Sequence, residues 1–155
     1  MRLTIAFVSL LLFAGAASAA SDTAQPTLPI ETISIDTPKG PVRFKVEMAT
    51  AWRQQEQGLM FRKHMAPDAG MLFDFHKPIQ MSFWMKNTYL PLDMLFIRAD
   101  GTVSSVAANA KPLSLKSIPS TEPVQAVLEI NAGRAAALGI GEGAKVHSAI
   151  FAGGR

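Results

Sequence analysis

Proline and glycine interrupt this sequence so often that it argues against a bundle of long helices. Its 155 residues include 10 Pro and 11 Gly, which end helices and favour turns. Between the turns lie short apolar runs of strand length. The chain is long enough for one domain and hardly for two. We therefore predict a mainly β fold, a compact antiparallel β-sandwich or barrel-like single domain with one or two short helices.

Alternation and turn signals place the expected elements. Residues 42–48 alternate strictly between apolar and charged side chains, and residues 31–36 also alternate. The turn 37–41 between them predicts an antiparallel hairpin, and Asp100-Gly101 predicts a second one. Further strands are expected at 71–75, 80–86, 92–98, 102–107, 124–130 and 145–151, short helices at 51–57 and 131–138, and a long loop at 109–123.

The N-terminus predicts export. A short basic start precedes an almost wholly apolar run over residues 3–15, and Ala17-Ser18-Ala19 fits the A-x-A cleavage rule. The run is shorter than the roughly 20 residues of a membrane span. We expect a signal peptide at 1–19 cleaved after Ala19 or Ala20, with a periplasmic or secreted product and no stable membrane span. An uncleaved anchor is the alternative. Residues 20–29 then read as a flexible leader and 30–155 as the domain.

Composition narrows the possible functions. Lys+Arg 15 against Asp+Glu 12 gives a net charge of +3, too mild for a nucleic-acid binder. The absence of Cys excludes disulfides, thiolate metal sites and cysteine nucleophiles. The three histidines are not spaced as metal-binding histidines usually are. We therefore expect no metal, no other cofactor and no nucleic-acid partner.

Several motifs resemble the small exported family called domain of unknown function 192. They are GLMFR at 58–62, GMLF at 70–73, FWMKNT at 83–88 and PLDMLFI at 91–97. The resemblance covers roughly residues 42–150 and implies a compact, mainly β domain without an assigned activity. The chain departs from the family at Gln55, where members often carry Arg, and at Ala144, where they often carry Asp.

The polar residues of the FWMKNT and PLD motifs form the main candidate site. If 80–86 and 92–98 pair as a hairpin, Lys86 lies opposite Asp93, and Trp84 shares their face. In a structural interpretation, Lys86 and Asp93 pair. In a ligand-site interpretation, Trp84 and Lys86 line a shallow binding surface.

The two residues that follow Lys86 take part in both interpretations. Asn87 and Thr88 either bond loop amides through their side chains or, as polar donors, belong to the ligand site. The sequence leaves this choice open.

Two further charged residues are candidates for the same site. Arg62 ends an apolar run, so it can bind a carboxylate or phosphate, or pair with a core acid such as Glu129 or Asp93. Glu129 alternates with Val127, which predicts a partly buried carboxyl. If Arg62, Lys86, Asp93 and Glu129 converge, they form either a structural network or the site itself.

Three functions remain open. The first is a binding or interaction module of the cell envelope, with an unknown small molecule, a glycan or an envelope protein as partner. The second is an envelope enzyme acting on a glycan through Asp93 or Glu129. The third is a copper carrier, because seven of the eight methionines lie within 48–94 and thioethers bind Cu(I). Core packing is the simpler explanation for those methionines.

Overall fold

The alternating segments form the hairpin that their pattern predicts. In the computed structural model, which describes residues 22–151, β1 (Ile30–Ile35) pairs antiparallel with β2 (Val42–Ala49). The chain then runs through α1 (Trp52–Gln57) to β3 (Ala69–Ile79), which lies parallel to β2. This pair is parallel because a helical crossover, not a hairpin, connects the two strands.

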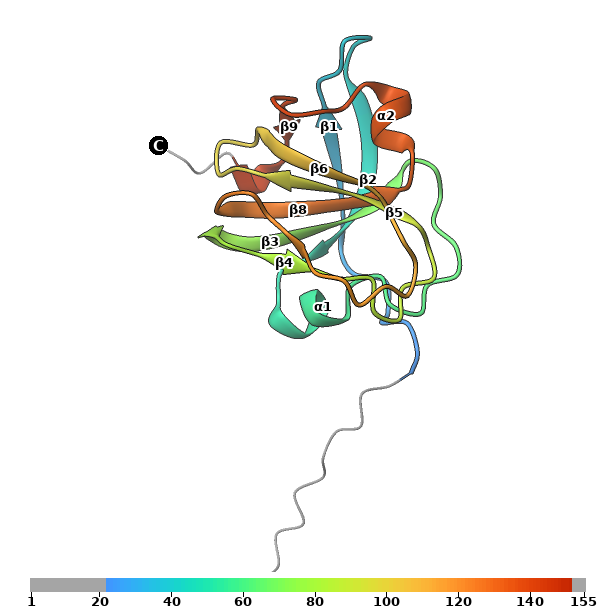
Figure 1. Cartoon of the computed structure of the whole chain (residues 1–155). Coiled ribbons are helices and arrows are strands. Elements are labelled where there is room, and N and C mark those ends of the chain that lie inside the picture. The colour runs from blue at the N-terminus through green and yellow to red at the C-terminus, as the bar shows by residue number, and fades with distance from the viewer. Residues whose placement is uncertain (1–21, 152–155) are drawn as a thin grey trace, which may run out of the picture.

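The remaining main strands are antiparallel to their neighbours. The seven-stranded sheet has the order β6-β5-β8-β3-β2-β1-β9 and curls into a half-barrel (Figure 1). Its other members are β5 (Leu92–Ile97), β6 (Val103–Ala110), β8 (Val124–Asn131) and β9 (Val146–His147). The expected mainly β fold with two short helices is confirmed, and β5 and β6 form the hairpin that Asp100-Gly101 predicts.

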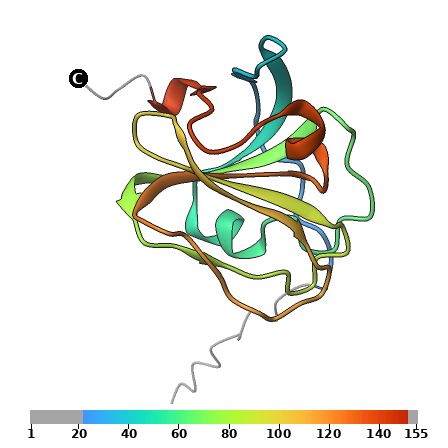
Figure 2. The same ribbon diagram turned by 45° about the horizontal axis from the view of Figure 1, so that its top comes forward.

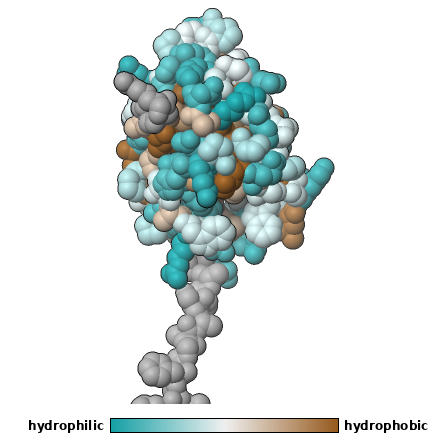
Figure 3. All heavy atoms as spheres, turned by 90° about the vertical axis from the view of Figure 1, so that its left-hand side faces the viewer, coloured by the Kyte–Doolittle hydropathy of each residue, from teal (hydrophilic) through white to brown (hydrophobic). Residues whose placement is uncertain are grey.

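An apolar layer covers each face of the sheet. On β5, Leu95 and Ile97 belong to one layer, while Met94 and Phe96 belong to the other. The first layer packs under α2 (Arg134–Leu138), and α1 lies on the opposite side of the sheet (Figure 2). Figure 3 shows mainly hydrophilic residues on the outer surface of one side, with apolar residues reaching it in separate groups.

The predicted hairpin between 80–86 and 92–98 is wrong. The first segment forms only β4 (Ser82–Phe83), which pairs with β7 (Ile118–Pro119), a strand inside the expected long loop 109–123. Alternation alone cannot distinguish a partner near in sequence from one 35 residues away. Lys86 is therefore not opposite Asp93, whose register partner on β8 is Ile130.

Both ends of the domain differ from the expectation. The last expected strand, 145–151, is reduced to β9 and is followed by the 3-10 turn η1 (Ala149–Phe151). The predicted signal peptide lies outside the described residues. Part of the expected leader is docked on the domain, because Gln25 donates to the Gln54 and Gly58 carbonyls and the Leu28 amide donates to Glu47. No helix within residues 22–151 is long and apolar enough to cross a membrane.

Candidate functional site

A pocket of about 270 Å³ lies between α1 and β4. Its floor comes from β3 and β8, and its walls are predominantly apolar. Phe83 of β4 lines it and makes edge contacts with Phe73 and Phe96, with ring centroids 5.2 and 6.2 Å apart. Three distant parts of the chain therefore build one concave, mostly apolar surface, which is the usual form of a small-molecule site.

The carboxyl group of Glu129 is the one buried acidic group that lines this pocket among the described residues. Glu129 lies on β8, between Met71 of β3 and Met94 of β5, and only 5% of it is exposed. Burial, uncompensated by a charge or a hydrogen bond from residues 22–151, raises the pKa of Glu129 to about 8. At neutral pH the group is therefore mostly protonated, and it can donate or accept a hydrogen bond.

Two aromatic side chains frame the opening. Trp52 at the start of α1 is 73% exposed, and Trp84 just after β4 is 48% exposed, and both line the pocket. The ammonium of Lys86 lies 5.1 Å from the centroid of the Trp84 ring, a cation–π contact. The expected proximity of Trp84 and Lys86 is confirmed, although the hairpin that suggested it does not form.

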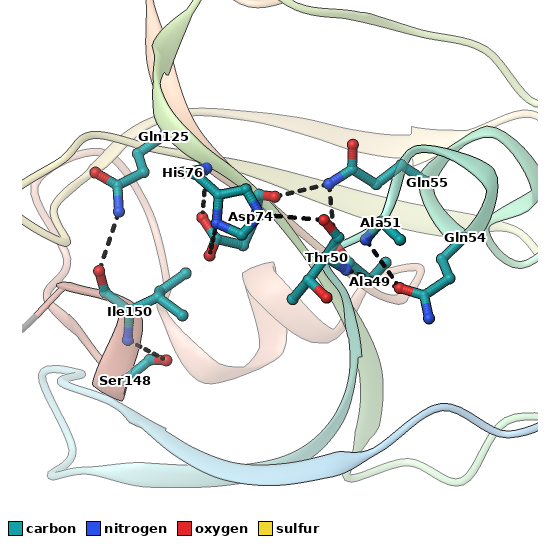
Figure 4. A network of polar contacts seen from close by, with 10 residues as sticks. All are labelled: Ala49, Thr50, Ala51, Gln54, Gln55, Asp74, His76, Gln125, Ser148 and Ile150. Atoms are coloured by element: carbon teal, nitrogen blue, oxygen red, sulfur yellow. Dashed lines mark hydrogen bonds and ion pairs between the residues drawn. The ribbon is translucent and has the colours of Figure 1, made fainter.

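A network of polar contacts fastens α1 over the pocket (Figure 4). Gln55 points from the helix toward the sheet, where its side-chain amide donates to the carbonyls of Ala49 and Asp74 at 3.1 and 2.7 Å. His76 lies beside the same region, with its ring 3.0 Å from the Asp74 carboxylate and 3.1 Å from the Thr50 carbonyl. Gln55 thus joins the helix to the end of β2 and the middle of β3, and His76 joins β3 to Thr50 just before the helix, so the pocket wall is held at several points.

The four charged residues whose convergence the sequence left open do not form one cluster. Arg62 forms a two-pronged ion pair with Glu47, with both N–O distances 2.9 Å. Asp93 is fully buried and accepts hydrogen bonds from the amides of Asn109 and Ala135, both at 2.9 Å. The expected pairing of Asp93 with Lys86 or Arg62 is therefore wrong, because backbone amides take the place of a cationic side chain.

The two other candidates from the sequence, Asn87 and Thr88, have different positions relative to the pocket. Thr88 is buried, lines the pocket and donates from its hydroxyl to the Lys86 carbonyl at 3.1 Å. Asn87 adopts a φ of 53°, and its carbonyl accepts a bond from the Phe61 amide. Trp84, Thr88 and Glu129 are thus brought together at the pocket, while Arg62 and Asp93 are placed elsewhere.

Sequence reasoning missed the apolar half of the site. Phe73 and Phe75 line the pocket from β3, and Met60 lines it from the turn after α1. Their alternation indicates burial without saying whether the buried face meets another side chain or a cavity. The GLM motif after α1 is the one signal that could have linked that turn to the site.

The histidines and the methionines were the residues from which the sequence could suggest a metal site. No group of three or more His, Asp or Glu is placed to hold a metal among residues 22–151. Met71, Met85 and Met94 are fully buried in the apolar layer beneath the pocket, so these methionines act as core residues.

The fold and the pocket define a small, curled-sheet β domain with one acidic group at the base of an apolar cavity. The chain belongs to the DUF192 family (uncharacterized ACR), whose profile matches residues 34–148. The family that the sequence motifs indicated is thereby confirmed.

Two crystal structures share this fold. One is a candidate transcription regulator from Sinorhizobium meliloti 1021, 46% identical, with a TM-score of 0.78 over 82% of this chain and 99% of that chain. The other is a protein of unknown function from Novosphingobium aromaticivorans DSM 12444, 40% identical, with a TM-score of 0.77 over 86% of this chain and 97% of that chain. A comparison with curated proteins found no match.

Proposed function

We propose that this protein is an exported ligand-binding domain of the cell envelope, and that its pocket takes a small molecule with an apolar body and one polar end. The observation that supports this most directly is Glu129, a buried carboxyl group at the base of an apolar pocket that finds no partner among residues 22–151. Burying a polar group without a partner costs folding free energy. A ligand that bonds to Glu129 would recover that cost.

The walls of the pocket support an apolar ligand body. Phe73, Phe83 and Leu59 offer apolar surface, and the exposed ring of Trp84 at the rim can cover a bound ring or alkyl chain. A cavity of about 270 Å³ suits a small molecule or one side chain of a larger partner, and is too small to enclose a polymer.

A thermal-shift screen of the mature domain tests this proposal. The library contains envelope sugars, muropeptides and small apolar molecules with one polar group, and the Trp52→Phe background makes Trp84 the fluorescent reporter. We expect hits that raise Tm and change Trp84 emission. Glu129→Gln should weaken these hits, and Glu142→Gln, a carboxylate with a 75% exposed side chain, should leave them unchanged. Hits that are insensitive to Glu129→Gln would contradict the pocket assignment.

The export part of the proposal rests on the apolar run and the A-x-A sequence alone. We expect the mature protein to begin at Ala20 or Ser21. N-terminal sequencing of protein from the periplasmic fraction measures this directly. Intact Met1 in the membrane fraction would instead identify an uncleaved anchor.

One observation favours an enzyme as a second candidate function. A carboxyl group with a pKa near 8 holds its proton at neutral pH, as a general acid must. Glycoside hydrolysis uses two carboxyl groups, and Glu56 at the exposed rim is the other carboxyl group among the residues that line the pocket. Release of reducing ends from peptidoglycan that disappears in Glu129→Gln would support this candidate. Asp93 has no part in it, because it is fully buried and held by two backbone amides.

A further inference from the structure

We propose that the pocket selects organic cations, specifically primary ammonium compounds with an aromatic or alkyl body, and that Glu129 binds the ammonium group as a carboxylate. The inference rests on the proposed function and specifies the class of ligand. It is drawn from the charges that line the pocket, the aromatic rings around it and the unpartnered state of Glu129.

The charge of the pocket is opposite to that of the chain. The sequence carries 15 Lys and Arg and a net charge of +3, yet the residues that line the pocket include two acids, Glu56 and Glu129, and no Lys, Arg or His. A bound carboxylate or phosphate would lie beside two carboxyl groups and no cation of the lining, since the Lys86 ammonium is held on the Trp84 ring at the rim. A bound cation would meet opposite charge at the rim and at the base.

Aromatic rings around the pocket also favour a cation. Trp52 and Trp84 at the rim, and Phe73, Phe75 and Phe83 within it, supply five ring systems. The faces of such rings attract ammonium groups, and aromatic cages are a common way to bind them. The contact of Lys86 with the Trp84 ring at 5.1 Å shows that one of these rings already holds a cation from the same chain.

The buried carboxyl group of Glu129 is the binding position that we infer for the ammonium group. Glu129 is 95% buried, lines the cavity and has no hydrogen-bond or charge partner within residues 22–151. When an ammonium ion enters, the Glu129 carboxyl loses its proton to the solvent, and the ammonium N–H groups donate to the resulting carboxylate. Charge-assisted bonds of this kind are about twice as strong as neutral ones.

This exchange makes binding depend on pH. The side chains that face Glu129 from β3 and β5 are Met71 and Met94, which do not titrate, and Glu56 is the other titratable group of the pocket. Because Glu129 must lose its proton, ammonium binding should strengthen as pH rises from 6 toward 8 and then level off. Binding of a neutral analogue should weaken or stay constant over the same range.

Isothermal titration calorimetry with three isosteric probes tests the inference. The probes are benzylamine, benzyl alcohol and benzoate, titrated into the mature protein at pH 7 in phosphate and in Tris. We expect benzylamine to bind about tenfold or more tightly than the alcohol, and benzoate not to bind. The dependence of the enthalpy on the buffer should show close to one proton released per benzylamine and none per benzyl alcohol.

Variants separate the inference from the proposed function. Glu129→Gln should reduce benzylamine affinity about tenfold or more and abolish proton release, and it should weaken benzyl alcohol binding by a clearly smaller factor, because the neutral alcohol loses no charge-assisted bond. Glu142→Gln makes the same substitution outside the pocket and should alter neither probe. Thermal melts verify that both variants fold. Benzyl alcohol binding as tightly as benzylamine would overturn the cation inference and leave the pocket standing. Failure of all three probes and of the wider screen would overturn both.

Discussion

Two buried carboxyl groups on neighbouring strands have opposite surroundings. Asp93 on β5 is 0% exposed and Glu129 on β8 is 5% exposed. The two strands pair, with Asp93 opposite Ile130, the residue that follows Glu129. Asp93 accepts hydrogen bonds from the amides of Asn109 and Ala135. Glu129 has no such donors within residues 22–151, and burial raises its pKa to about 8.

The difference separates a structural acid from a candidate functional one. The Ala135 amide belongs to the first turn of α2, where amides lack partners within the helix. Asp93 therefore joins α2 to the sheet and to the end of β6, and its two oxygens are used for folding. Glu129 contributes nothing comparable to folding and faces a cavity, which is why we assign the ligand to it.

The largest expected effect is on the pH dependence of stability. The folded protein holds the Glu129 proton up to about pH 8, whereas an unfolded chain releases it near its ordinary value of 4.5. Rising pH therefore favours unfolding between these values, by up to about 1.4 kcal/mol per pH unit. Urea melts at pH 5, 6, 7 and 8 should show the wild type losing stability relative to Glu129→Gln. Parallel curves for the two proteins would remove the contrast with Asp93.

Replacement of the structural acid should cost somewhat less, about 2 to 3 kcal/mol. Asp93→Asn retains one oxygen acceptor but turns an amide N–H₂ toward one of two buried amide donors, which then lacks a partner. Urea melts at pH 7 measure this loss, with Asp68→Asn at an exposed position as the control. If Asp93→Asn were as stable as the wild type, its role as the link to α2 would be incorrect.

The smallest effect should come from the lysine first expected to pair with Asp93. Lys86 is exposed and contacts the Trp84 ring, so Lys86→Gln should change the free energy of unfolding by less than about 1 kcal/mol. It should instead alter Trp84 emission in the Trp52→Phe background, because the cation leaves the ring. A loss of stability equal to that of Asp93→Asn would mean that the two residues are coupled after all.

Local pattern was sufficient for elements whose partners are near in sequence. The alternation of 42–48, the turn 37–41 and Asp100-Gly101 predicted two hairpins that the structure contains. The same reasoning failed for 80–86, since β4 pairs with β7 across the long loop. A strand's alternation defines its faces but not its neighbour.

The candidate site was predictable only in part for the same reason. Glu129 and Trp84 stood out in the sequence as a partly buried acid and an aromatic beside polar residues. Phe73 carried no signal of a cavity, the turn after α1 carried only the GLM motif, and nothing local indicated that α1 and β8 would line the same pocket.

The sequence by itself indicated that Asp93 and Glu129 would be partly buried acids, since each alternates with apolar neighbours on a strand. Only the tertiary structure decided which of them would be satisfied. The amides that bond Asp93 come from residues 16 and 42 positions away, and the pocket wall opposite Glu129 comes from α1, more than 70 residues earlier in the chain. A carboxyl group's protonation depends on the donors and dielectric around it, and in this protein the folded chain brings both from distant segments.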